Sequence, residues 1–142
     1  MRDTFAVVFL ISLVAGSCSA AVCEGKNHPG VTALYLAEST GNNNGAKEWV
    51  SDFRELIQKS ASYCLVNQEK TAVLVVSMLG RDADVNGIST AISIAVYSAK
   101  EGTFLDHWLY ISRKDSLQSS AEKAVTALEK EVSELKKLRL VR

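Results

Sequence analysis

The chain has little histidine, cysteine or proline: its 142 residues include two histidines, three cysteines and one proline. Neither His28 nor His107 has a second ligand at the spacing that a zinc site requires. No Gly-X-Ser-X-Gly segment singles out a serine that His107 could activate. The sequence therefore predicts no catalytic residue, no metal and no cofactor, and we interpret His107 as structural.

The chain also lacks an excess of charge of one sign. Its 16 Lys and Arg residues balance 16 Asp and Glu residues. Nucleic-acid binding is driven mainly by neutralisation of phosphates, so this balance argues against a nucleic-acid partner. Beyond the N-terminal region, no apolar run is long enough to cross a membrane.

The N-terminal twenty residues read as an export signal. Arg2 precedes an apolar run over 5–15, and small side chains fill most of 16–20. This pattern is typical of a cleaved signal peptide, and the run is too short to span a bilayer comfortably. We expect 1–20 to be removed and 21–142 to form a single domain. A buried N-terminal helix or strand is the alternative.

Cleavage after Ala20 would remove Cys18 and leave Cys23 and Cys64, an even pair in an oxidising compartment. The sequence therefore predicts a Cys23–Cys64 disulfide, which would stabilise the fold by roughly 4 kcal/mol in the chain-entropy description. Two free thiols are the alternative. In a third interpretation Cys18 is the lipidated first residue of a bacterial lipoprotein, although Ala15 stands where a large aliphatic residue is usual.

Hydrophobic periodicity predicts one strand, one helix, three strands and a final helix. The strands are expected over 31–37, 72–79, 88–98 and 103–112, and the helices over 46–63 and 115–138. Asp115 and Gln118 would form a capping box at the start of the second helix. The predicted fold class is α+β, a two-layer α/β sandwich of order β-α-β-β-β-α. Its sheet would be mostly antiparallel, with both helices on one face.

Alternation along the last two strands divides their residues between two faces. The expected core face carries Ile88, Ile92, Ile94, Val96, Leu105, His107, Leu109 and Ile111. The opposite face would carry a shallow, partly apolar surface of small and aromatic residues. Its expected binding residues are Tyr97, Asp106, Trp108 and Tyr110.

Two loops resemble ligand-binding motifs without completing them. Residues 82–87 match the first half of a calcium loop, but Ser93 occupies the position of the closing carboxylate, so an acidic hairpin turn is expected. Residues 41–47 lie where a phosphate-binding loop would, but their glycine spacing is wrong for one. We expect a plain connection from strand to helix.

The helical segment 53–60, a variable loop and the strand 72–77 follow one another in an order that resembles small α/β domains of the bacterial envelope. These are the amino-terminal domain of the Tol-system periplasmic protein and the lipoproteins that activate penicillin-binding proteins. The resemblance implies an adaptor domain that binds another envelope protein and catalyses nothing. It transfers no functional residue to this sequence.

The leading hypothesis is an exported, non-enzymatic module, periplasmic or secreted, that binds a protein partner in the envelope or the extracellular space. A membrane contact is expected only if Cys18 is lipidated. The alternatives are a small secreted ligand-binding protein or hydrolase, and a secreted inhibitor or immunity-type protein. The oligomeric state stays open.

Overall fold

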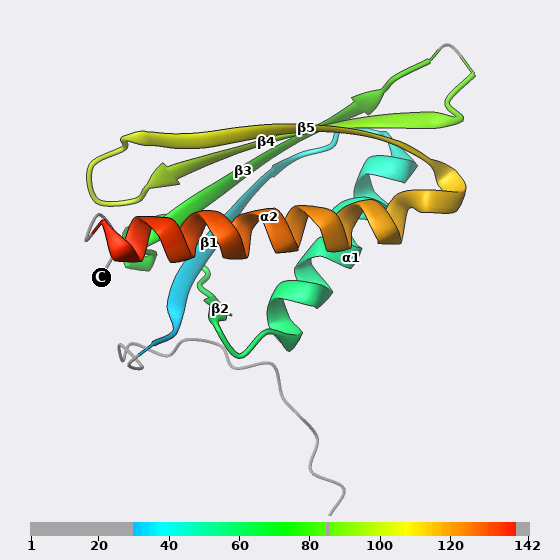
Figure 1. Ribbon diagram of the computed structural model, residues 1–142. Helices are drawn as coiled ribbons and strands as arrows, with labels where there is room; N and C mark the ends of the chain where they lie inside the picture. Colours follow the sequence, from blue (N-terminus) through cyan, green and yellow to red (C-terminus); the bar gives the residue numbers. More distant parts are fainter. Residues whose placement is uncertain (1–29, 85, 139–142) are drawn as a thin grey trace, which may run out of the picture.

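The computed structural model describes residues 30–84 and 86–138. The expected signal peptide, Cys18, Cys23 and His28 lie outside these residues. Two helices and five strands form the described domain (Figure 1). They are β1 (Thr32–Ser39), α1 (Asn44–Lys59), β2 (Tyr63–Leu65), β3 (Leu74–Asp82), β4 (Ser89–Ser98), β5 (Phe104–Arg113) and α2 (Leu117–Lys137).

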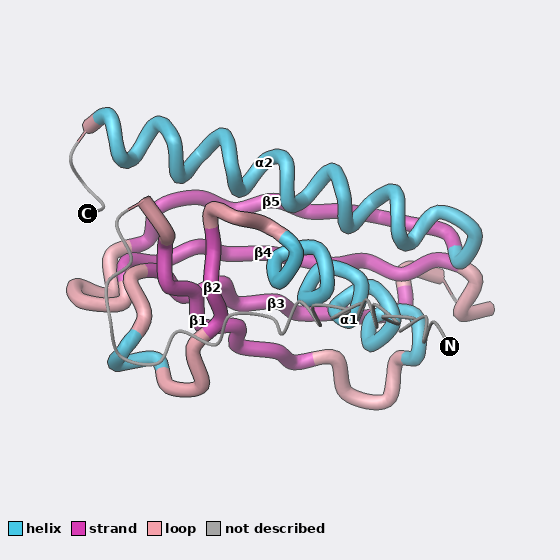
Figure 2. Tube along the Cα trace, turned by 90° about the horizontal axis from the view of Figure 1, so that it is seen from below, coloured by secondary structure: helices cyan, strands magenta, loops and turns pink. Residues whose placement is uncertain are grey.

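The five strands form one mixed sheet in the order β2-β1-β3-β4-β5. β1 pairs in parallel with β2 and β3, whereas the longer ladders between β3, β4 and β5 are antiparallel. Both helices lie on one face of this sheet, here called the helix face (Figure 2). No described element covers the other, open face. The α+β prediction is confirmed, with the short strand β2 added to the expected order.

The first turns of the two helices are stabilised in different ways. The side chain of Asn43 caps α1 by accepting a hydrogen bond from the backbone N–H of Ala46. The capping box predicted for α2 is wrong: Asp115 lies in a 3-10 turn, Lys114–Ser116, and Ser116 at the cap position makes no side-chain cap bond. That turn follows β5 directly, so the chain enters α2 without the extended cap residue that a capping box needs.

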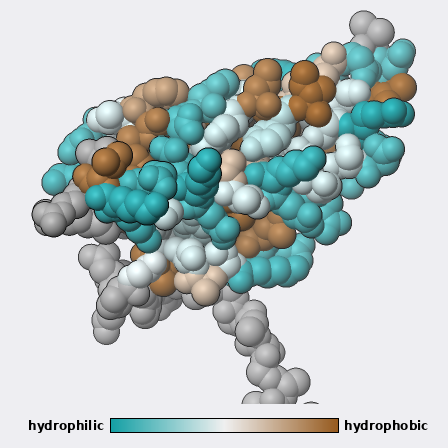
Figure 3. Space-filling model, in the orientation of Figure 1, coloured by the Kyte–Doolittle hydropathy of each residue, from teal (hydrophilic) through white to brown (hydrophobic). Residues whose placement is uncertain are grey.

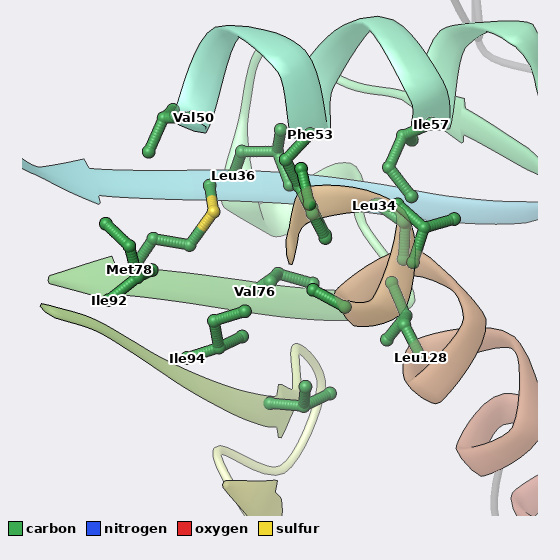
Figure 4. Packing of buried hydrophobic residues seen from close by; sticks show 14 of the residues in the cluster. Leu34, Leu36, Val50, Phe53, Ile57, Val76, Met78, Ile92, Ile94 and Leu128 are labelled. Atoms are coloured by element: carbon green, nitrogen blue, oxygen red, sulfur yellow. The ribbon is translucent and has the colours of Figure 1, made fainter. Parts of the chain in front are cut away.

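The core centres on Trp49, which is fully buried between α1, α2 and the sheet. Its ring stacks on Phe53 at a centroid distance of 5.4 Å and lies 6.1 Å from the ring of Tyr110 on β5. Its Nε1 donates to the Oγ of Ser120 on α2 at 3.1 Å. Figure 4 shows further aliphatic side chains packed between the sheet and the helices, among them Leu128 of α2.

Cys64 lies on β2, is 6% exposed and is not a free thiol. It pairs in register with Ala33, one position along from the pair formed by Thr32 and Tyr63. Its predicted partner, Cys23, lies outside the described residues, so the Cys23–Cys64 disulfide stays a prediction.

Two glycines let α1 approach the sheet closely. A Cβ on Gly80 of β3 would lie 2.3 Å from the Cβ of Ala46, and a Cβ on Gly45 would lie 2.3 Å from the Oγ1 of Thr90. Real side-chain atoms do not approach so closely. The first turn of α1 is therefore seated directly on β3 and β4.

We expect Gly80→Ala to lower the free energy of unfolding by about 1 to 3 kcal/mol, because the added methyl group forces α1 away from the sheet. Urea denaturation monitored by circular dichroism measures this change. Ser77→Ala, on the open face of the same strand, is the control. Adding Ala46→Gly should recover part of the loss, and strict additivity of the two changes would contradict the contact.

Candidate binding surface

The pairing of β4 with β5 decides which residues the open face presents. Ile92 pairs with Tyr110 and Ile94 pairs with Trp108. Ile92 and Ile94 are buried in the core, so Trp108 and Tyr110 share the helix face with them. Asp106, which pairs with Val96, lies on that face too.

The predicted placement of Asp106, Trp108 and Tyr110 on the uncovered face is therefore wrong, and of the four predicted binding residues Tyr97 alone lies on the open face. The physical reason is that both alternating sets in β5 contain large apolar side chains. Aromatic rings with polar tips fill the space under the helices at the sheet edge, whereas the aliphatic side chains face outward. Tyr110 is half-buried there, and burial raises the pKa of its hydroxyl.

A β-bulge between Val96 and Tyr97 explains why Tyr97 is separated from the other three. Val96 pairs with Asp106, but Tyr97 pairs with Phe104, so β5 carries one extra residue. Tyr97 and Phe104 contact each other edge to face on the open side, with ring centroids 5.7 Å apart. Strict alternation through β5 does not anticipate this shift.

Large apolar side chains are concentrated on the open face. Six large hydrophobic residues of the described chain are exposed, and four of them belong to open-face strand positions. These four are Leu79 at 43% exposure, Phe104 at 56%, Leu109 at 61% and Ile111 at 68%. Figure 3 shows apolar side chains along the upper margin of the molecule, over β5. We call these four residues the apolar cluster; the sequence prediction placed Leu109 and Ile111 in the core.

Small side chains separate the members of the apolar cluster. The open-face positions of β4 before Tyr97 are Ser89, Ala91, Ser93 and Ala95. Ser93 lies in register between Leu79 of β3 and Leu109 of β5. These four small residues form a shallow strip along β4, here called the low row, with larger side chains on both sides.

The charges of the open face have one sign. Its strand positions include no Asp, Glu or Lys, whereas Arg81 of β3 and Arg113 of β5 lie at the same end of the sheet. Neither arginine side chain forms a hydrogen bond or ion pair with another described residue. The strand carboxylates Glu38, Asp82 and Asp106 occupy helix-face positions instead.

The acidic hairpin between β3 and β4 uses its carboxylate for folding. Asp84 accepts hydrogen bonds from the backbone N–H groups of Asn86, Ile88 and Ser89, which lower the pKa of its carboxyl. That contribution to stability is present at neutral pH and is lost as the pH falls through the lowered pKa. Asp84 therefore stabilises the hairpin turn that the sequence predicts between β3 and β4.

His107 and Ser93 form a hydrogen-bonded pair on the open face, with Nε2 and Oγ 2.8 Å apart. A serine activated by histidine needs a third group that orients the imidazole through Nδ1. Among the described residues no side chain bonds to that nitrogen, and the nearby Asp106 carboxylate instead accepts from the backbone N–H of His107. The pair lacks the orienting part of a nucleophilic site.

A hollow of about 630 Å³ lies on the helix side, between β2 and the C-terminal half of α2. Tyr63, Glu129, Ser133 and Lys136 are among the residues that line it. Burial, and then the charge of Glu129, raise the pKa of the Tyr63 hydroxyl. Its walls carry groups of both charges, so they favour no single class of ligand.

Neither a family model nor a curated protein matches this chain. Solved structures do match its fold. TolB from Acinetobacter baumannii is 8% identical, with a TM-score of 0.57, and the match covers 72% of this chain and 28% of TolB. Lipoprotein GNA1162 from Neisseria meningitidis is also 8% identical, with a TM-score of 0.46 over 72% of this chain and 96% of that protein.

The likeness to TolB confirms the predicted resemblance to an envelope α/β domain at the level of the fold. This chain matches less than a third of TolB's length. Within the described residues, no helix is long and apolar enough to cross a bilayer. The same residues contain no cluster of three or more metal-ligating side chains.

The two faces of β5 should respond differently to truncation. We expect Trp108→Ala to lower the free energy of unfolding by about 3 kcal/mol, because the side chain packs against the core. Ile111→Ala should change it by less than about 0.5 kcal/mol, because that side chain is exposed. Urea denaturation of both variants measures the difference, and equal effects would contradict the assigned faces.

Proposed function

We propose that this chain is an exported, non-enzymatic protein-binding module of the cell envelope, and that its partner binds the open face of the sheet. This proposal rests on the concentration of exposed large apolar side chains on that face. Four of the six such residues in the described chain belong to this one face. Apolar side chains gathered on one side of a soluble domain mark interaction sites more often than apolar residues scattered singly.

The helix face differs from the open face in a way that supports this proposal. The helix face is closed by α1 and α2 around Trp49, so its aromatic residues already have partners within the domain. In the apolar cluster, Phe104 contacts the ring of Tyr97, whereas Leu79, Leu109 and Ile111 lie beside small side chains of β4 and are exposed. Burying a leucine or isoleucine side chain contributes roughly 1.5 to 3 kcal/mol, so even partial cover of Leu109 and Ile111 favours association.

The fold shared with TolB agrees with an envelope location, and the adaptor role rests on the open face rather than on that likeness. A secreted inhibitor or immunity-type protein would use the same face on a single enzyme. A ligand-binding protein would use the hollow beside Tyr63. Thermal melting with a panel of small ligands separates that last alternative, because a bound ligand raises the melting temperature by mass action.

We expect Ile111→Ser combined with Leu109→Ser to abolish capture of the partner while leaving the domain folded. Polar side chains at these exposed positions remove the apolar contact without disturbing the core. The measurement is affinity capture of the tagged protein after crosslinking in the cells that make it.

Leu138→Ser is the matched control, because Leu138 and Ile111 are both 68% exposed but Leu138 lies at the end of α2. Capture should be unchanged in this control. A double variant that retains every partner of the parent protein would overturn the proposal.

Export is tested by the intact mass of the protein recovered from its own cells. We expect a chain that begins at Ala21 and gains the mass of two hydrogens on reduction, as a Cys23–Cys64 disulfide requires. Additional mass on a chain beginning at Cys18 would instead show lipidation. An uncleaved chain with reduced cysteines would contradict export.

A further inference from the structure

We infer that the occupant of the open face is an amphipathic helix of another protein that has an apolar stripe and carboxylates near one end. This inference rests on the proposed function, because it gives the chemistry of the partner that the open face binds. Its three supports are the charge of the face, the spacing of its apolar side chains and the length of the low row along β4.

Charge complementarity indicates the carboxylates. Arg81 and Arg113 carry the two formal charges of the open-face strand positions, and no described residue forms an ion pair with either. Asp84, the nearby acid of the β3–β4 hairpin, is engaged by three backbone N–H groups. A partner that covers the apolar cluster therefore meets two cations without partners at one end, and carboxylates there gain charge-assisted hydrogen bonds.

The same charges argue against two other occupants. A second copy packed face to face has no open-face carboxylate to offer either arginine, so like charges would be buried without compensation. An anionic lipid surface is usually held by clusters of about four to eight cations, whereas the open-face strand positions carry two arginines, Arg81 and Arg113. A protein segment can supply the acids at the arginine end alone.

The spacing of the apolar cluster fits a helix. Leu79 of β3 and Leu109 of β5 lie on either side of Ser93 of β4. Two strand spacings separate them by roughly 10 Å, which matches the roughly 10 Å diameter of a helix with its side chains. A helix along β4 would rest on the small side chains and contact both leucines.

The low row also sets the length of the helix. It extends from Ser89 to Ala95, and the Tyr97–Phe104 pair lies beyond its end. From Ser89 to Ala95 the strand covers roughly 20 Å, which corresponds to a helix of about 13 residues. The arginines lie at the other end, so the carboxylates are expected near one terminus of the bound helix.

A photoreactive benzophenone amino acid at position 109 tests this inference in the cells that make the protein. We expect an adduct with a segment of another protein that has an apolar stripe at helical spacing and carboxylates near one end. Combining the probe with Arg81→Glu and Arg113→Glu should lower the adduct yield about tenfold, because attraction becomes repulsion. Lys123→Glu with Lys130→Glu, an equal change of charge on exposed α2 positions, should leave the yield unchanged.

The outcomes separate this inference from the proposed function. An adduct with a neutral or basic segment, or a yield unaffected by the arginine changes, overturns the acidic helix but leaves a protein-binding face. An adduct with a second copy, or with another part of the same chain, overturns the inferred occupant. A lipid adduct, or no adduct at position 109 from a folded protein, overturns both.

Discussion

Packing around one tryptophan orders the whole domain. Trp49 extends from α1, stacks on Phe53, approaches Tyr110 of β5 and donates to Ser120 of α2. α1 thus meets β5 and α2, from the far end of the described chain, at one fully buried ring. Because Tyr110 is drawn beneath the helices by this contact, alternation turns its neighbours Leu109 and Ile111 outward. The character of the open face is therefore a consequence of how the covered face is filled.

The order of elements was predictable because long periodic segments carry a strong signal. Both helices and the four longer strands follow from the spacing of their apolar residues, and glycine-containing turns indicate the hairpins. β2 was not predicted, because its three residues are too few to establish a period. Its pairing with β1 is set by tertiary contact, with Tyr63 buried beside α2.

The sequence predicted which side of the sheet carries the candidate surface, but not which residues of β5 lie on it. The sequence indicated that one face of β4 and β5 carries small and aromatic residues, and β4 follows this pattern. β5 does not, because leucine and isoleucine compete with tryptophan and tyrosine for the same side, and hydropathy alone does not decide between them. The decision came from Trp49 and from the bulge at Tyr97, neither of which is a local property of β5. That the charged residues at open-face strand positions are both arginines follows only from the register of all the strands.

β5 is also the last strand of the sheet, so the outer side of its ten residues has no neighbouring strand within the described chain. It contains no proline or lysine, the residues that commonly discourage the addition of a foreign strand. One backbone donor of β5 is already occupied, because the N–H of His107 donates to the carboxylate of Asp106. The bulge between Phe104 and Asp106 interrupts this edge near the start of β5. Beyond it, the edge is open to pairing with a foreign strand, next to the apolar side chains that a bound partner would shield.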